Sequence, residues 1–352
     1  MTAQCSWRMG VRAIVVCVMT VASSGFLPSA SAQSSLGICR SGLADTDEAT
    51  RQKTLENIHK IGVTWFRDSV NYPSPEYVAR FVDELKIAQQ QKLKILVNIL
   101  QLGSDYDGNL STNTCGWKDK KLSAINLKKY DQRLRDLFGA LKAAHVQIDA
   151  VEFGNEIDQY CFNADVPNGR RLSASELVTA ARGYGEFLKS GAMVLHEYFP
   201  DAKIITFGMA NIVNNRPYHL ENPAQFVAML RNINGYDYLD NSSYHVDGIG
   251  VHVYSSANNI SGDATQTLRK DFAALGNSKP FWITEFGFTH NNFPNKKGQT
   301  LGQAIGELLG TFSNLSKTMS IGPAFFYSYN GWLVDDNGNL LPAAYALSPK
   351  KQ

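Results

Sequence analysis

The sequence predicts a single-domain (β/α)8 barrel, the TIM-barrel architecture, and three observations support this prediction. Short, almost continuously apolar runs recur along the chain, stretches with helical spacing separate them, and no linker rich in Pro, Gly or Ser divides the 352 residues. Runs of this kind are typical of parallel strands, which are buried on both faces. Eight runs are expected to be strands: Leu36–Cys39, Val63–Arg67, Ile95–Ile99, Ala150–Glu156, Ile204–Gly208, Ile249–Tyr254, Phe281–Glu285 and Pro323–Tyr327.

The stretches between these runs predict helices. Apolar residues recur at helical spacing from Val78 to Ala88 and from Leu301 to Phe312. Ser74-Pro75 fits the N-cap and first position of one helix, and Ser173 with Glu176 fits a capping box for another. A doubly wound open sheet is the alternative fold. No Gly-x-Gly-x-x-Gly motif follows the first run, so this alternative brings no support for nucleotide binding.

The first 32 residues have the pattern of a signal peptide. Arg8 and Arg12 precede an apolar run from Ala13 to Ala22, and Ala30-Ser31-Ala32 has the small-x-small pattern of a cleavage site. That run is too short to span a bilayer, and no later stretch reaches the roughly 20 apolar residues that a transmembrane helix needs. We therefore expect residues 1–32 to be removed, leaving a secreted or periplasmic mature chain, residues 33–352, without a membrane span.

The charge balance argues against one class of partner. The chain has 34 Lys and Arg against 32 Asp and Glu, and the leader holds two of the arginines and no acid, which leaves 32 of each sign. Nucleic-acid binding relies on a surplus of Lys and Arg that neutralises phosphates, so no nucleic-acid partner is expected. The strand ends offer no convincing His and carboxylate cluster, so we expect neither a metal nor another cofactor. A monomer is the expected state.

Three cysteines remain after the leader is removed. An odd number in an exported protein suggests one disulfide and one spare thiol. Cys115 lies in the long connection after the third expected strand, and Cys161 follows the fourth. Because the loops after barrel strands gather on one face, we expect a Cys115–Cys161 disulfide with Cys39 free, although the sequence does not fix the connectivity.

Two glutamates terminate apolar runs. Glu156 ends the fourth expected strand and Glu285 the seventh. A carboxylate at the carboxyl end of a barrel strand lies at the mouth where barrel enzymes carry out their chemistry. Two carboxylates facing each other there are what glycoside hydrolysis requires, one as acid and one as nucleophile or base. Either glutamate alone could equally cap a strand or pair with a loop arginine.

The neighbouring residues favour the catalytic interpretation. Asn155 directly precedes Glu156, and Thr284-Glu285-Phe286-Gly287 follows three strands later. This arrangement resembles glycoside hydrolase clan A, the retaining (β/α)8 glycosidases. Further residues fall where clan members keep active-site groups: Arg67, His252-Val253-Tyr254 and Trp332. The sequence departs from many clan members at two points. It has Gly154 where they have Trp, and Ile157-Asp158 after Glu156 where they often have Pro-Asn. The family within the clan and its sugar therefore stay open.

The resemblance implies a role for each residue. Glu156 would be the acid/base, which starts protonated, and Glu285 the nucleophile. Asn155 would hydrogen-bond the sugar 2-hydroxyl and Glu285, while Arg67 and the Tyr254 hydroxyl would keep Glu285 ionised. The remaining substrate-binding candidates are His252, which could instead be a satisfied interior histidine, and Trp332, the best aromatic candidate for the apolar face of a sugar. Glu152, which shares the face of Glu156 four residues lower, is expected to be structural.

The sequence therefore predicts a secreted retaining glycoside hydrolase that cleaves β-glycosidic bonds in a polysaccharide or oligosaccharide. A transglycosylase would use the same covalent intermediate and pass the sugar to another sugar. A non-catalytic barrel that binds glycans is the third hypothesis. The matched pair of glutamates argues against it, because a binding protein needs neither an acid nor a nucleophile.

Overall fold

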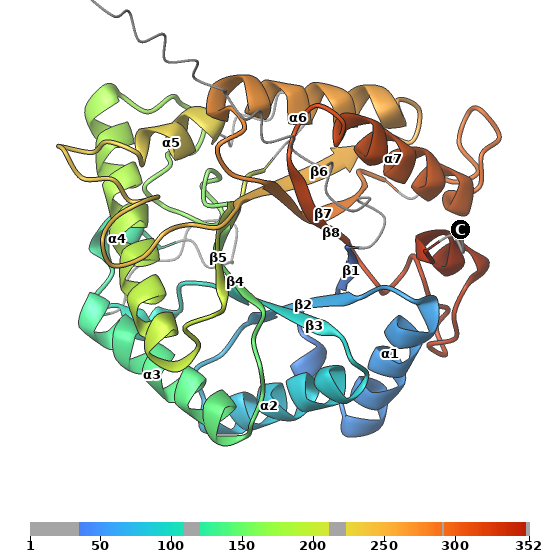
Figure 1. Ribbon diagram of the computed structural model, residues 1–352, viewed down its shortest axis with the longest axis horizontal. Helices are drawn as coiled ribbons and strands as arrows, with labels where there is room; N and C mark the ends of the chain where they lie inside the picture. The colour runs from blue at the N-terminus through green and yellow to red at the C-terminus, as the bar shows by residue number, and fades with distance from the viewer. Residues whose placement is uncertain (1–34, 109–119, 211–222, 291, 350–352) are drawn as a thin grey trace, which may run out of the picture. The chain divides into compact units, whose positions relative to one another are not determined.

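The computed structural model describes residues 35–108, 120–210, 223–290 and 292–349. They form a sheet of eight parallel strands in the order β5-β4-β3-β2-β1-β8-β7-β6. Figure 1 shows the strands at the centre with the helices around them. The strands are β1 (Leu36–Cys39), β2 (Trp65–Val70), β3 (Lys94–Ile99), β4 (Ala150–Asn155), β5 (Lys203–Gly208), β6 (Ile249–Ser255), β7 (Phe281–Phe288) and β8 (Ile321–Phe326).

Parallel bridges between the two edge strands bring the sheet to closure. Ile205 on β5 pairs with Gly248, which precedes β6, and Met209, just after β5, pairs with Val251. Almost every strand residue is buried, as expected of strands that face the barrel interior on one side and helices on the other. The predicted (β/α)8 barrel is thus confirmed.

Helices cover the outside of the barrel. Their bounds are α1 (Glu48–Ile61), α2 (Pro75–Gln90), α3 (Leu127–Ala143), α4 (Ala174–Tyr198), α5 (Pro223–Met229), α6 (Ile260–Leu275) and α7 (Leu301–Leu315), with 3-10 turns η2 (Leu43–Asp45), η3 (Gly103–Asp105), η4 (Leu122–Ala124) and η5 (Pro342–Leu347). The Ser74 side chain accepts from the Tyr77 amide at the start of α2, and Ser173 and Glu176 form the predicted capping box of α4. These caps satisfy amides that would otherwise lack partners.

The expected strands all form, with shifts at their ends. The largest corrections concern β2 and β7, each of which continues three residues beyond the expected last residue. Arg67 and Glu285 therefore lie within strands rather than at their ends. Glu156 lies one residue beyond β4.

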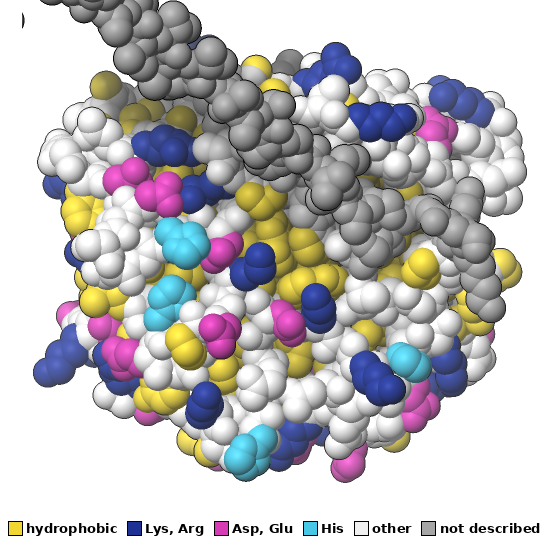
Figure 2. All heavy atoms as spheres, in the orientation of Figure 1, with side chains coloured by type: hydrophobic (Ala, Val, Ile, Leu, Met, Phe, Trp, Pro, Cys, Tyr) yellow, Lys and Arg dark blue, Asp and Glu magenta, His cyan; other side chains and the backbone are white. Residues whose placement is uncertain are grey.

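Some predictions concern residues outside the described part of the chain. The signal peptide, residues 1–32, and Cys115 both lie there, so cleavage and the Cys115–Cys161 disulfide stay predictions. Cys39 is free and buried, as expected. None of the described helices is long and apolar enough to cross a bilayer. The face in Figure 2 carries acidic and basic side chains interspersed with one another, which agrees with the near balance of charge.

The barrel interior has an apolar layer beneath a polar one. The apolar layer is a separate cluster of buried residues: Cys39, Trp65, Leu96, Ala150, Ile205, Trp282 and Phe325. Trp65 and Trp282 meet edge to face with ring centroids 5.4 Å apart. Side chains two residues further along β2 and β4, Arg67 and Glu152, point the same way because direction alternates along a strand. The polar layer starts with these two side chains.

Candidate active site

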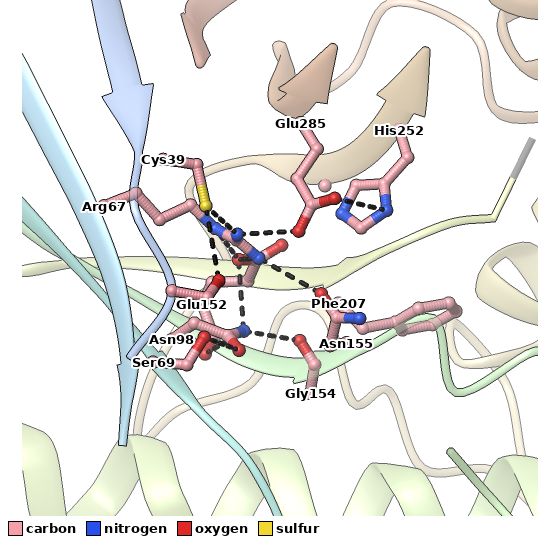
Figure 3. Close-up of polar contacts among 12 residues, drawn as sticks. Cys39, Arg67, Ser69, Asn98, Glu152, Gly154, Asn155, Phe207, His252 and Glu285 are labelled. Atoms are coloured by element: carbon pink, nitrogen blue, oxygen red, sulfur yellow. Dashed lines mark hydrogen bonds and ion pairs between the residues drawn. The ribbon is translucent and has the colours of Figure 1, made fainter. Parts of the chain in front are cut away.

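The polar layer brings together residues from four strands. Arg67 comes from β2, Asn155 from the end of β4, His252 and Tyr254 from β6 and Glu285 from β7. Figure 3 shows the Arg67 guanidinium between Glu152, Asn155 and Glu285, with His252 beside Glu285. With Glu156, which contacts His252, six of the seven predicted site residues therefore lie in one group joined by hydrogen bonds and ion-pair contacts.

A bulge in β7 directs Glu285 into the barrel. Trp282 belongs to the interior apolar layer, so simple alternation would place Glu285, three residues later, on the outer face. The register against β6 shifts at this point: Val251 lies opposite Ile283 and His252 opposite Glu285, which makes Thr284 an extra residue. Bulges commonly redirect side chains next to active sites, and this one places Glu285 beside Arg67.

A sharp turn after β4 positions Glu156. Gly154 has φ 93° and Glu156 has φ 43°, both in the left-handed region. A Cβ at position 154 would lie 3.0 Å from Ile157 Cγ2 and 3.2 Å from Phe207 Cβ, so both space and backbone angle favour glycine there. The Glu156 amide donates to the Gly208 carbonyl at 3.0 Å, and the Gln159 side-chain amide donates to Glu156 Oε2. This turn accounts for a glycine at position 154.

Arg67 organises the polar layer. It is fully buried and donates to Glu152 Oε2 and Glu285 Oε1, each at 2.8 Å, and to Asn155 Oδ1 at 3.2 Å. Its Nη1, which donates to Glu285, also lies 3.0 Å from the Cys39 sulfur. The guanidinium fork thus fixes two carboxylates and the asparagine at once, a geometry that a lysine ammonium does not reproduce.

Glu285 is held as an anion. Burial acts to raise its pKa, but the charges of His252 and Arg67 and the hydrogen bonds from Tyr254 and Arg67 outweigh burial and lower the pKa below its ordinary value. Tyr254 donates its hydroxyl to Glu285 Oε2, as the resemblance implied. Burial, followed by the charges of Glu285 and Glu156, raises the pKa of Tyr254 well above 10, so the phenol keeps its proton. Asn155 differs from expectation, since its side-chain oxygen bonds Arg67 rather than Glu285.

His252 lies between the two carboxylates. Its Nδ1 is 2.8 Å from Glu156 Oε1 and 3.7 Å from Glu285 Oε2, and the side chain is fully buried. Burial acts to lower the pKa of His252, but the two glutamates together outweigh it and raise the pKa above 6.5. A Cβ at Gly208, on β5, would lie 2.0 Å from His252 Nε2, so that glycine leaves the space in which the ring sits.

Trp332 does not join this group in the described structure. It is partly buried and packs against Phe288, which ends β7, and Phe293, with centroids 6.0 Å and 6.4 Å apart. Besides Tyr254, an aromatic ring near the carboxylates is Tyr327, which meets Tyr254 edge to face at 6.3 Å. Burial, followed by the charge of Glu285, raises the pKa of Tyr327 to about 12. Tyr327 was expected to end the eighth strand, and no role at the site was predicted for it.

Sequence reasoning also missed the residues that support the polar layer. Asn98, on β3, donates to Glu152 Oε2 at 3.1 Å and to the Gly154 carbonyl at 2.7 Å, and it accepts from Ser69 at 3.1 Å. Glu152 is buried and pairs with Arg67, in agreement with the structural role expected for it. The signal for Asn98 was a polar residue inside an apolar run. Among the described residues, no group of three His, Cys, Asp or Glu side chains could hold a metal ion.

Comparison with known proteins places the fold but not the family. No family model matches the chain, and no curated protein matches its sequence. Solved structures with similar folds include an exo-β-1,4-mannosidase from an Opitutaceae bacterium, strain TAV5, with a TM-score of 0.59 and 12% identity, covering 89% of this chain and 58% of that one. The chain thus spans less than two thirds of the mannosidase.

Two further structures match over most of both chains. A broad-specificity endoglucanase from an uncultured bacterium has a TM-score of 0.58 and 14% identity, covering 90% of this chain and 93% of that one. A structure described under two fungal β-1,4-galactanases has a TM-score of 0.56 and 16% identity, covering 89% of this chain and 93% of that one. At these identities the likeness concerns the fold, so this chain adopts the (β/α)8 barrel on which these glycosidases are also built.

Proposed function

We propose that this protein is a retaining glycoside hydrolase in which Glu285 is the nucleophile and Glu156 the acid/base. The observation that carries the proposal is that both carboxylates approach the same nitrogen, His252 Nδ1, at 2.8 Å and 3.7 Å. The two glutamate oxygens can be no farther apart than these distances combined, about 6.5 Å. Retaining enzymes have carboxyl groups about 5 to 5.5 Å apart, whereas inverting enzymes have them about 6.5 to 9.5 Å apart. A spacing of at most about 6.5 Å therefore favours the retaining class.

The environments of the two glutamates fit different roles. Glu285 is ionised and held by Arg67 and Tyr254, so it can attack the anomeric carbon without first losing a proton. The Glu156 side chain is 17% exposed against 9% for Glu285, which suits a group that must exchange protons with water. Glu156 would protonate the leaving oxygen and then take a proton from the water that releases the sugar.

The substrate class and location extend this proposal. The structural neighbours named above are described as acting on β-1,4-mannosides, as a broad-specificity endoglucanase and as β-1,4-galactanases, which favours a β-linked polysaccharide or oligosaccharide as substrate. The signal-peptide pattern of residues 1–32 favours export, with a Cys115–Cys161 disulfide forming outside the reducing cytoplasm.

A polysaccharide screen tests the proposal. The mature chain would be incubated with β-mannan, β-1,4-galactan, mixed-linkage β-glucan and xyloglucan, and the first product would be analysed by NMR before it mutarotates. We expect release of a β-configured sugar from at least one of them. A product of α configuration would exclude the retaining mechanism, and a glycan-binding barrel would bind a polysaccharide without releasing sugar.

A further inference from the structure

A groove on the outer wall of the barrel has no part in the chemistry described above. It has a volume of about 320 Å³ and lies between the loop after β2, the start of α2, η3 and the first half of α3. Val70, Pro73, Val78 and Leu137 form its apolar part. None of its lining residues belongs to the catalytic group, which points into the barrel interior, so the groove is a second site toward the same, carboxyl end of the strands.

An exposed aromatic ring stands at the groove. Tyr72 is 54% exposed, among the most exposed of the large hydrophobic side chains in the described chain. It meets Tyr77 edge to face, with centroids 5.2 Å apart and an interplanar angle of 74°. Tyr77 is itself buried and donates its hydroxyl to the Ser69 carbonyl at 3.1 Å. The buried Tyr77 thus supports the Tyr72 ring, about half of whose surface stays exposed.

A buried donor without a partner lies in the groove wall. Arg133 is 8% exposed, and its Nε and Nη2 donate to the two oxygens of Asp105 at 2.7 Å and 2.8 Å. Its Nη1 is buried and has no hydrogen-bond partner among the described residues. Leaving a charged donor unsatisfied is costly, but this nitrogen is covered, so a ligand in the groove reaches it only if the groove wall moves.

The charges at the groove favour an uncharged ligand. Lys129 is bound by Asp107 at 2.8 Å and Arg133 by Asp105, so neither cation is left unneutralised for an anionic group. Asp136 accepts from Gln132 at 2.9 Å through one oxygen, which leaves the other for a ligand hydroxyl. The groove therefore offers hydrogen-bond donors, acceptors and an aromatic face without net positive charge.

We propose that this groove binds a neutral saccharide chain at a site separate from the catalytic centre. A pyranose ring presents an apolar C–H face that can lie on Tyr72, while its hydroxyls can pair with Asp136. The choice of a saccharide rests on the proposed function, since a polysaccharide-degrading enzyme meets long chains that can contact a second site. The location and chemistry of the groove do not depend on that function.

Native gel electrophoresis in the presence of polysaccharide tests the proposal. The full mature chain carrying Glu285→Gln, which prevents digestion, would run through gels containing β-mannan, β-1,4-galactan, mixed-linkage β-glucan or xyloglucan. Tyr72→Ala and Asp136→Ala would be compared with Tyr345→Ala, because Tyr345 has the same 54% exposure and lies in η5, away from the groove. Thermal melting would verify that each variant is folded.

We expect at least one polysaccharide to retard the protein and Tyr72→Ala to weaken that binding about tenfold, the effect of losing one aromatic contact. Tyr345→Ala should bind as the parent does. Absence of retardation by all four polysaccharides, or equal retardation of both tyrosine variants, would overturn the proposal. Binding that depends on Tyr72 in a protein that hydrolyses no glycan would instead leave this site in place and remove the proposed catalytic function.

Discussion

Replacement of Gly208 by alanine tests whether the position of His252 controls the chemistry. The added Cβ would lie 2.0 Å from His252 Nε2, 2.4 Å from its Cδ2 and 2.8 Å from Thr284 Oγ1. To restore an ordinary contact of 3.4 Å, Nε2 must move by about 1.4 Å, which is half the length of the 2.8 Å contact between Nδ1 and Glu156. Because β5 and β6 are neighbours in a nearly closed barrel, the backbone has little freedom to relieve the overlap.

We expect kcat to fall about 100-fold, the size of effect that a misplacement of about 1 Å produces at a catalytic group. Overpacking should also reduce the free energy of unfolding by about 1 to 3 kcal/mol. The assay is steady-state hydrolysis of an aryl β-glycoside of the sugar found in the screen, together with thermal melting. The control is Gly310→Ala, within α7, where an added Cβ meets nothing within 4 Å and should stabilise the helix by about 0.5 to 1 kcal/mol.

A double variant separates displacement of His252 from general damage. If Gly208→Ala acts through the histidine ring, then adding it to His252→Ala, where the ring is absent, should cost little further activity. The reasoning would be refuted if the double variant lost activity by the product of the two single-variant factors. It would also be refuted if Gly208→Ala alone kept kcat within threefold of the wild-type value.

The remaining predictions concern Arg67, Asp158 and Glu156. Arg67→Lys keeps the charge but loses the fork that joins Glu152, Asn155 and Glu285, so kcat should fall about 100-fold; a kinetic assay showing less than a threefold change would contradict this. Burial raises the pKa of Asp158 to about 8, whereas an unfolded Asp titrates near pH 3.9, so its stabilising contribution is complete below about pH 4 and is lost as pH rises through 8. The melting temperature of Asp158→Asn should therefore fall less between about pH 4 and pH 8 than that of the wild type. An equal fall in both proteins would contradict this prediction. Glu156→Ala should still form the glycosyl-enzyme from substrates with good leaving groups, and added azide should restore turnover with a β-glycosyl azide as product; azide without effect would argue against Glu156 as the base.

The sequence was sufficient to predict the barrel and to select its two glutamates. All eight apolar runs form strands because burial on both faces leaves a direct pattern in the sequence. Glu156 and Glu285 stood out as carboxylates adjoining such runs. The extension of β2 was missed because the strand continues through the polar residues Asp68 and Ser69. The extension of β7 was missed because the charged Glu285 was taken as the end of the run, although Phe286 to Phe288 continue the strand.

What the sequence could not supply are the contacts between strands. The inward direction of Glu285 depends on a bulge at Thr284, which exists only in the register with β6. The requirement for Gly208 comes from a histidine 44 positions away in the chain. Trp332 was the preferred aromatic residue because the resemblance places an active-site group after the last strand, whereas Tyr327 approaches the site only through the packing that brings it against Tyr254 on β6. Each of these facts depends on long-range packing rather than on local pattern.

Trapping the covalent intermediate tests the central claim most directly. The mature enzyme would be treated with an activated 2-deoxy-2-fluoro glycoside of the sugar identified in the screen, digested, and analysed by mass spectrometry to locate the label. The account predicts one label on Glu285 and no label in the Glu285→Gln variant. A label on Glu156 or any other residue, or turnover by the Glu285→Gln variant at the wild-type rate, would contradict it.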